Sequence, residues 1–177
     1  MDDRGFTIIE LVLVIIVAAI IAAVAVPQFS RYWAGIKLGN ATMKIASDIR
    51  YAQNRATTTQ QRSQVNFAAG GISYTINSCA IADYTSSTCN CGGAGWSLVK
   101  TIDLSDDFKD VTISGVVNNC VEFDSLGRPY YNTTCNTATS CNTSAGTGPP
   151  RPDITVQYSG APNETITVQT QTGMVSY

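Results

Sequence analysis

A single carboxylate, Glu10, lies within an otherwise uncharged apolar run that extends from Phe6 to Val26. A carboxylate without a partner is costly to place in an apolar environment, so this position needs a counter-charge. If the chain is cut after Gly5, the new amino group at Phe6 becomes the nearest cation, either in the same chain or in the next copy of an assembly. The chemistry expected here is therefore charge pairing at a processed N-terminus.

Six cysteines are the second group of residues with distinctive chemistry, and all of them follow the apolar run. They are Cys79, Cys89, Cys91, Cys120, Cys135 and Cys141. An even number of cysteines outside a membrane indicates disulfides formed in an oxidising compartment. Zinc is disfavoured because the chain has no His and Cys89 and Cys91 lack the usual ligand spacing. Clustering favours one bridge among Cys79, Cys89 and Cys91 and one from Cys135 or Cys141, while a direct Cys89–Cys91 bond is disfavoured.

Motifs for catalysis or ligand binding are not found in the sequence. Without His, neither a Ser-His-Asp nor a Cys-His site can form. The glycines within 92–95 open no helix, so they do not predict a phosphate-binding loop. Asp106, Asp107 and Asp110 could hold a cation, but a solvated turn is the better interpretation, and no EF-hand spacing is present. We therefore expect no enzyme, no metal and no cofactor.

The charge balance is close to neutral. The formal net charge is −2, and removal of residues 1–5 leaves 10 Lys+Arg against 11 Asp+Glu, or −1. Arg50, Arg55 and Arg62 form only a sparse basic set. Neither feature predicts a nucleic-acid partner. With 177 residues, the chain suits one domain plus an anchor.

The apolar run predicts a helix long enough to span a bilayer. Its 21 residues from Phe6 to Val26 extend roughly 30 Å, the thickness of the hydrocarbon core. Pro27 follows and is expected to kink or loosen the helix because it lacks an N–H. Residues 31–33 combine a cation with two aromatic side chains, a composition typical of the membrane–water interface.

Helical periodicity then continues on one face only. Apolar residues recur at spacings of three and four: Leu38, Ala41, Ile45, Ile49, Ala52 and Ala56. This pattern predicts a second, amphipathic half of the helix that packs on a sheet. Gly35 and Gly39 favour a flexible joint, and the β-branched residues at 57–59 should end the helix.

From Ser63 the apolar period changes to two. Residues 64–67 and 72–76 predict a hairpin. Further strands are expected at 97–104, 111–117, 120–123, 154–158, 165–170 and 174–177. Residues 77–96 and 132–153 are predicted to be polar loops that the cysteines pin. The predicted fold is α+β, with a long N-terminal helix packed on an antiparallel β-sheet head.

The first residues of the chain follow a known processing pattern, GFTIIEL at 5–11, which leads into the apolar helix. This segment resembles the processing site of type IV pilins and type II secretion pseudopilins. The resemblance implies that a prepilin peptidase cuts after Gly5 and that Phe6 is N-methylated. It also implies that Glu10 sets the register between neighbouring subunits in a filament. The leader, residues 1–5, sums to −1, whereas leaders in this family are usually basic.

A second resemblance extends into the head. Residues 44–56 and 65–67, together with 121–127 and 166–175, look like the H-type minor pseudopilins and their pilus counterparts. In those proteins an amphipathic helix with an Ala-rich, Arg-containing second half leads straight to the first hairpin. The resemblance implies a minor subunit of a type IV pilus or type II secretion pseudopilus, involved in filament assembly and protein secretion.

The two resemblances together imply an organisation and a set of partners. Residues 1–5 form the leader, 6–30 a transmembrane helix, 31–60 an amphipathic helix and 61–177 a β-rich periplasmic head. The chain crosses the bacterial inner membrane once before it joins a pilus or pseudopilus filament. Its expected partners are the prepilin peptidase, other pilin or pseudopilin subunits and the inner-membrane assembly platform.

Four other interpretations stay open. The run could be a plain transmembrane anchor, or a secretory signal peptide, because residues 23–25 have the small-x-small pattern of a cleavage site. A signal peptide predicts a periplasmic protein that begins near Val26. A major type IV pilin would dominate sheared filaments. A DNA-binding minor pilin predicts salt-sensitive DNA binding by the head.

Overall fold

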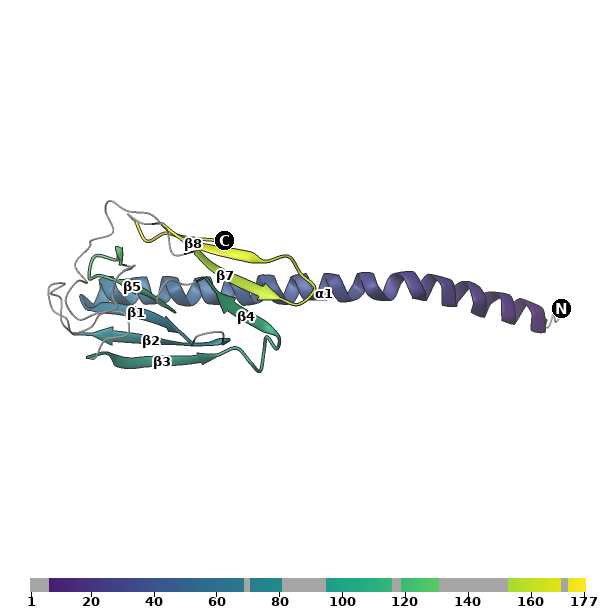
Figure 1. Ribbon diagram of the computed structural model, residues 1–177, viewed down its shortest axis with the longest axis horizontal. Helices are drawn as coiled ribbons and strands as arrows, with labels where there is room; N and C mark the ends of the chain where they lie inside the picture. The colour runs from purple at the N-terminus through teal and green to yellow at the C-terminus, as the bar shows by residue number, and fades with distance from the viewer. Residues whose placement is uncertain (1–6, 69–70, 81–94, 116–118, 131–152, 170–171) are drawn as a thin grey trace, which may run out of the picture.

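The computed structural model describes residues 7–68, 71–80, 95–115, 119–130, 153–169 and 172–177. One long helix, α1 (Ile8–Thr59), dominates it. Figure 1 shows that the second half of α1 lies against a β-rich head, while the first half projects away from it. This arrangement confirms the predicted α+β fold, with a long N-terminal helix and antiparallel sheets.

Helix α1 is continuous over 52 residues. The loosening expected at Pro27 and the joint expected at Gly35 and Gly39 do not interrupt it, although its first part curves gently in Figure 1. A proline removes one hydrogen bond from a helix and leaves the neighbouring ones in place. Beyond Ala34, packing against the head holds the helix, so glycine propensity does not decide its course.

The helix ends at Thr59, within the threonine run predicted to end it. The hydroxyls of Thr58 and Thr59 donate to carbonyls one turn earlier, at 2.8 Å each. Gln60 follows in the left-handed conformation, with φ at 55°, and its side chain donates to the Thr57 carbonyl at 2.7 Å. The Gln60 side chain thus satisfies a carbonyl that the end of the helix leaves without an intrahelical partner, whereas the threonine hydroxyls bond to carbonyls inside the last turns.

The head contains two antiparallel sheets, whereas the sequence predicted one. The first sheet has the order β3-β2-β1-β5-β6 and the second the order β4-β7-β8-β9. The strands of the first are β1 (Arg62–Phe67), β2 (Ser73–Cys79), β3 (Ser97–Asp103), β5 (Cys120–Phe123) and β6 (Pro129–Tyr130). Those of the second are β4 (Val111–Ser114), β7 (Asp153–Tyr158), β8 (Glu164–Val168) and β9 (Val175–Ser176). Alternation in a strand reports which face is buried and not which strand it pairs with, so the sequence did not separate the sheets.

The predicted hairpin forms between β1 and β2. Val65 lies opposite Ile76, and Phe67 lies opposite Tyr74. Strand β1 also pairs with β5, where Val65 faces Val121. Val65, Ile76 and Val121 therefore form one row across the sheet, and all three are buried.

The core lies between the second half of α1 and both sheets. Every residue of the predicted helical stripe is buried: Leu38, Ala41, Ile45, Ile49, Ala52 and Ala56. These side chains pack with the Val65 row and with Ile154 and Ile166 of the second sheet. Burying one large aliphatic side chain stabilises a fold by about 1.5–3 kcal/mol, so this half of α1 is held by its own chain.

Candidate functional site: the N-terminal helix and its attachment to the head

The helix begins with a capping box made by Thr7 and Glu10. Thr7 is the N-cap residue, and its hydroxyl accepts a hydrogen bond from the Glu10 backbone N–H at 3.3 Å. In return, the backbone N–H and the hydroxyl of Thr7 donate to Glu10 Oε2 at 3.0 and 2.9 Å. This contact was not among the predictions from sequence, although the Thr-x-x-Glu spacing is its known signature.

The capping box changes how the charge of Glu10 is understood. Its carboxylate is hydrogen-bonded within the chain and lies at the positive end of the helix dipole. Among the described residues, however, no cation pairs with it. The predicted cleavage after Gly5 and the predicted amine at Phe6 lie outside the described residues, so the charge pair stays a prediction.

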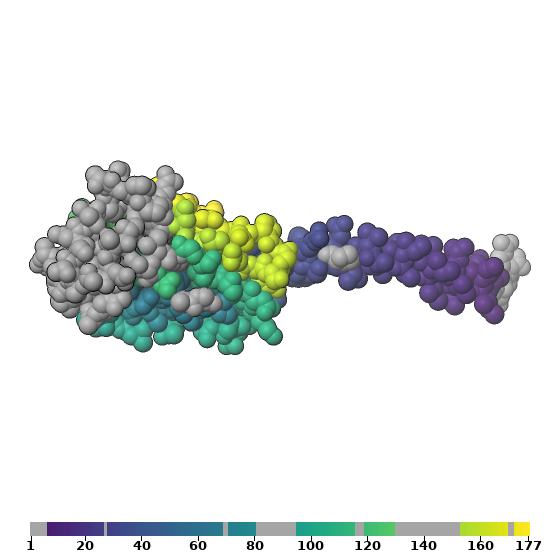
Figure 2. Space-filling model, viewed as in Figure 1, coloured from purple at the N-terminus to yellow at the C-terminus, as the bar shows by residue number. Residues whose placement is uncertain are grey.

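The apolar half of α1 has no partner within the described part of the chain. Its large side chains are exposed throughout, from Ile8 to Val26. In Figure 2 this half projects from the head as a bare rod. Among the described residues, α1 is the one helix long and apolar enough to cross a membrane. Such a surface needs an apolar environment from outside the chain.

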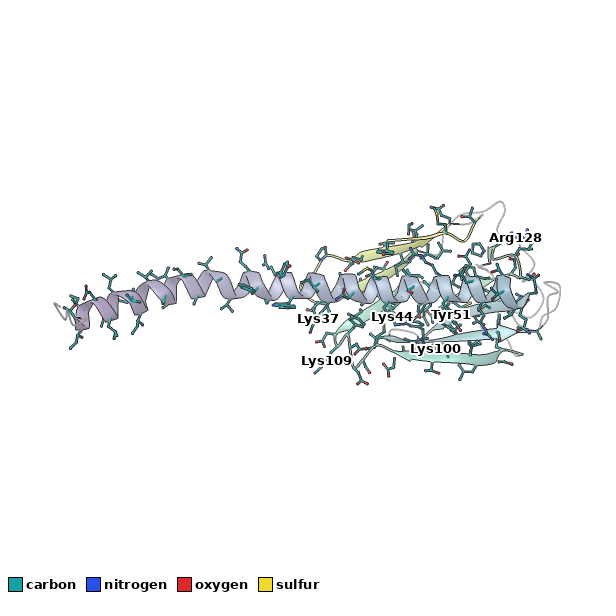
Figure 3. The ribbon with its side chains drawn as sticks, turned by 180° about the vertical axis from the view of Figure 1, so that it is seen from behind. Lys37, Lys44, Tyr51, Lys100, Lys109 and Arg128 are labelled. Atoms are coloured by element: carbon teal, nitrogen blue, oxygen red, sulfur yellow. The ribbon has the colours of Figure 1, made fainter. Side chains whose placement is uncertain are left out.

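A polar contact helps to attach the second half of α1 to the first sheet. Asp48 is buried and accepts from Lys44 Nζ at 2.6 Å and from the Tyr74 hydroxyl at 2.8 Å. Burial raises the pKa of Tyr74, and the Asp48 carboxylate raises it further. Tyr74 therefore stays protonated and remains a donor. Figure 3 shows Lys44 on the part of α1 that lies along the head.

Two turns of the head meet at Gln53 of the helix. Its side-chain amide donates to the Gly127 carbonyl at 2.9 Å and to the Thr172 carbonyl at 2.8 Å. Gly127 and Gly173 both have positive φ, at 77° and 68°. A Cβ at Gly173 would collide with the Gln53 amide and with the Gly127 carbonyl. Only glycine fits there, because the turn needs both the left-handed backbone and this close approach.

Two of the three arginines that form the sparse basic set, Arg50 and Arg62, make contacts within the chain. Arg50 donates to the Val175 carbonyl at 2.8 Å and lies over the Tyr177 ring, 5.4 Å from its centroid. Arg62 is buried in an ion pair with Glu122. Burial raises the pKa of Glu122 to about 7, although the adjacent Arg62 charge opposes the rise. These side chains do not form one exposed cationic surface.

Cys79 and Cys120 are both disulfide-bonded. They lie opposite Arg62 and Asn66 of β1, respectively, and those two positions are separated by roughly 13 Å along the strand. That separation exceeds the reach of a disulfide, about 7 Å between Cα atoms, so these two cysteines do not bond to each other. The other four cysteines lie outside the described residues, and the predicted pairing stays a prediction.

No further feature of the described residues points to a reactive site. The carboxylates Asp106, Asp107 and Asp110 lie exposed between β3 and β4, and the described residues include no group of ligands that could hold a metal. The backbone N–H of Ser105 donates to Asp103 at 2.9 Å and lowers the pKa of that carboxyl, as in a solvated turn.

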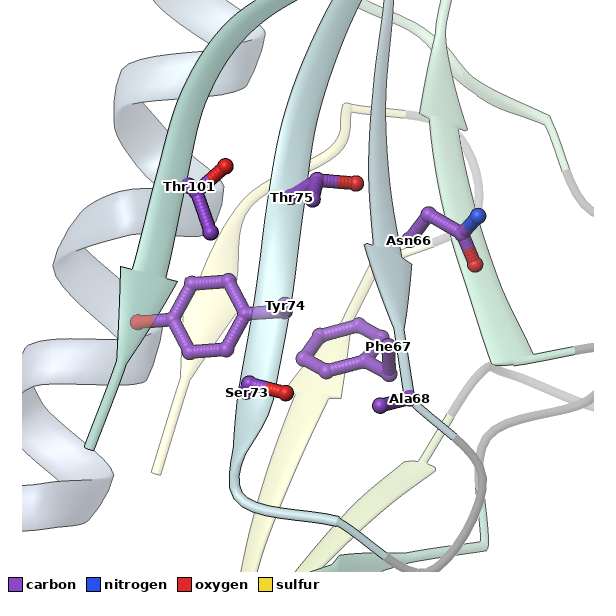
Figure 4. Close-up of a pocket in the computed structure, with 7 residues that line it drawn as sticks. All are labelled: Asn66, Phe67, Ala68, Ser73, Tyr74, Thr75 and Thr101. Carbon is purple, nitrogen blue, oxygen red and sulfur yellow. The ribbon is translucent and has the colours of Figure 1, made fainter. Parts of the chain in front are cut away.

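A hollow of about 210 Å³ opens beside the β1–β2 hairpin. The described residues that line it are neutral: Asn66, Phe67, Ala68, Ser73, Tyr74, Thr75 and Thr101 (Figure 4). The Phe67 and Tyr74 rings pack together there, with centroids 5.4 Å apart. With the Tyr74 hydroxyl bonded to Asp48, this lining offers no general acid or base.

Comparison with known proteins gives two matches. Residues 1–26 match the prokaryotic N-terminal methylation motif. In structure, the chain is similar to the type IV minor pilin FimU of Pseudomonas aeruginosa strain PAO1, with a TM-score of 0.52 over 82% of this chain and 90% of that chain. The sequences are 10% identical, so this likeness shows a shared fold. No curated protein matches the chain in sequence.

Proposed function

We propose that this chain, a type IV pilin-like protein by its N-terminal methylation motif and its fold, is a minor subunit of a type IV pilus or type II secretion pseudopilus. One observation carries the proposal. A single continuous helix joins an apolar half, exposed on all sides, to a half that packs in a folded head. The exposed half suits lipid before assembly and the helices of other subunits afterwards. This is the role of a structural subunit and requires no catalysis.

The proposed life of the subunit has two stages. It is first held in the inner membrane by the helix within residues 6–30, with its head in the periplasm, and a prepilin peptidase removes residues 1–5. Phe6 is then methylated, and the assembly platform moves the subunit into a filament. Lipid and neighbouring helices are similarly apolar, so the transfer costs little hydrophobic free energy.

Glu10 is proposed to set the register of that assembly. A filament core of packed helices has a low dielectric, where a charge without a counter-ion is costly. The Thr7 donors offset part of this cost but carry no charge. The new amino group at Phe6, in the same or a neighbouring subunit, supplies the cation. Only one stagger of the helices brings a neighbour's amine and Glu10 together.

The assignment as a minor subunit rests on two supports. The similar fold of FimU, described as a minor pilin, is one. The resemblance of residues 44–56 and 65–67 to H-type subunits is the other. We expect few copies in a filament, where these subunits contribute to assembly and, in a pseudopilus, to protein secretion.

The mature N-terminus tests the proposal. Intact mass and N-terminal peptide spectra should give a chain that starts at methylated Phe6. Gly5→Ala should be cut slowly or not at all, whereas Asp2→Ala, a control within the leader, should be cut normally. A mature chain that begins near Val26 would overturn the proposal in favour of a secreted protein. Quantified in sheared filaments, the protein should be scarce beside the principal subunit, and a dominant band would identify a major subunit instead.

A further inference from the structure

Three large aromatic residues follow the apolar half of α1, and we call Phe29, Tyr32 and Trp33 the aromatic ridge. Their exposed fractions are 63%, 66% and 58%. The rings of Tyr32 and Trp33 are in edge-to-face contact, with centroids 6.4 Å apart. Exposed aromatic surface of this kind is expensive in water and marks an interaction site.

The head covers α1 on one side only. Ala34 and Leu38 are the first residues of α1 that are buried against the head. Residues three, four or seven apart share a face of a helix. Arg31 is three residues before Ala34 and seven before Leu38, so it lies on the side of the head.

The ridge lies on the other side of the helix. Phe29 and Trp33 are four residues apart and so share a face of α1. Asn40 and Ser47, which are seven and fourteen residues after Trp33, lie on the same face and are exposed. Four residues later, Tyr51 is exposed as well. The ridge thus continues the stripe of α1 that the head leaves uncovered, and Tyr32 borders it. Interface aromatics placed only to set depth have no reason to gather on one side.

The height of the ridge matches the phospholipid headgroups. At about 1.5 Å per residue, the Cα atoms of Phe29 and Trp33 lie roughly 5 Å and 10 Å beyond that of Val26. Helical side chains slope back toward the N-terminus, which brings the Trp33 ring toward the outer edge of the headgroup layer. The headgroup region extends about 5–8 Å past the hydrocarbon core on each side. Trp and Tyr concentrate in this layer, because their rings are apolar and their N–H and O–H groups find hydrogen-bond partners there.

We propose that the aromatic ridge docks into the headgroup layer of the membrane while the subunit is held there before assembly, an inference that rests on the proposed function. Because the ridge occupies one side of the helix, it orients the anchor as well as setting its depth. The uncovered side of α1 faces the lipid, and the side that carries the head tilts away from it. The bound partner is a phospholipid surface continuous with the apolar half of α1.

The charge at the base of the head agrees with this orientation. The turn between β3 and β4 exposes Asp106, Asp107 and Asp110 beside Lys109. Figure 3 shows Lys109 at the level of Lys37 along α1, at the end of the head nearest the apolar half. Anionic phospholipids repel acidic surface of this kind. The turn therefore does not compete with the ridge for the membrane.

The chain has two tryptophans, which allows a test of depth with a matched control. Trp96→Phe leaves Trp33 as the sole indole, and Trp33→Phe leaves Trp96 in the head. Each full-length chain is reconstituted at low protein density in vesicles of phosphatidylethanolamine and phosphatidylglycerol, with bromines near the top or near the end of the acyl chains. Trp33 should lose much of its emission to the shallow bromines and little to the deep ones, and Trp96 should lose none.

A second variant tests the one-sided orientation. Arg31→Trp, combined with Trp33→Phe and Trp96→Phe, places an indole at nearly the same height on the side of the head. It should be quenched clearly less than Trp33, and equal quenching would overturn the orientation. If the chain floats with the vesicles but Trp33 is unquenched, the ridge does not dock in lipid. A cross-link from Trp33 to a second copy would then identify another subunit as its partner. If the chain does not float with the vesicles, the membrane-held stage of the proposed function fails as well.

Discussion

The two halves of α1 have the same secondary structure and opposite surroundings. Ile16, in the first half, is 55% exposed, whereas Ile45, in the second, is fully buried. The second half is held by contacts within its own chain. The first half is apolar on all sides, yet no described residue packs on it, so it needs an apolar environment from outside the described part of the chain. One half of this helix is therefore packed within its own chain, and the large apolar side chains of the other half are exposed along its whole length.

The acidic residues of the two halves differ in the same way. Asp48 is buried, and Lys44 and Tyr74 supply both a counter-charge and a hydrogen bond. Glu10 has hydrogen bonds from Thr7, but no cation among the described residues. Asp48 is thus satisfied within the described part of the chain. Under the proposed function, the counter-charge of Glu10 is the amine at Phe6 of the same or a neighbouring subunit.

The largest expected effect is on assembly. Glu10→Val should leave the protein inserted and cut, because it makes the anchor more apolar, but should abolish its incorporation into filaments beside wild-type subunits. Ile9→Val is the matched control and should assemble normally. Immunoblots of membranes and of sheared filaments measure both. Normal incorporation of Glu10→Val would remove the distinction drawn between the two carboxylates.

A pair of identical substitutions tests the two halves directly. Ile45→Ala should lower the free energy of unfolding of the head by about 2–5 kcal/mol, because it leaves a cavity in the core. Ile16→Ala should change it by less than about 0.5 kcal/mol, as exposed positions do. Urea titrations of the full chain in detergent micelles, followed by circular dichroism, give both values. Similar losses from both variants would contradict the division of the helix.

The attachment of the head to α1 can be probed through two glycines with positive φ. Gly173→Ala should destabilise the head by about 2–4 kcal/mol, because the new Cβ meets Gln53 and the left-handed backbone is strained. Gly160→Ala shares the positive φ but has nothing within 4 Å of its Cβ, so it should cost only about 1 kcal/mol. Thermal unfolding compares the two. Equal costs would mean that the Gln53 contact contributes nothing.

A pH effect on stability is expected from the head, through Glu122. Burial raises the pKa of Glu122 from 4.5 to about 7, so between these values the folded chain binds more protons than the unfolded chain. The contribution of Glu122 is fully present below pH 4.5 and is lost as the pH rises through 7, a change of up to roughly 3 kcal/mol. Urea midpoints of wild type and Glu122→Gln across this range measure it. The difference between the two proteins should change with pH, and a constant difference would contradict the raised pKa.

Much of this architecture follows from local pattern. The apolar run before Pro27, the helical stripe from Leu38 to Ala56 and the change of period at Ser63 predict the helix and its two halves. Most strands lie within a few residues of their predicted bounds. Local pattern suffices here because the period of burial distinguishes a helix from a strand, and length distinguishes an anchor from a core helix. The spacing of Thr7 and Glu10 is also a sequence signature, from which the capping box could have been predicted.

Other features depend on contacts between residues that are far apart in the sequence. The division into two sheets depends on pairing between distant strands, and alternation carries no information about partners. Gln53 bonds to carbonyls 74 and 119 residues away, and the Arg62–Glu122 pair spans 60 residues. The side of α1 that the head leaves uncovered, and with it the position of the aromatic ridge, is decided in the same way. Periodicity gives a helix two faces, and only the packed head determines which one stays free for a partner.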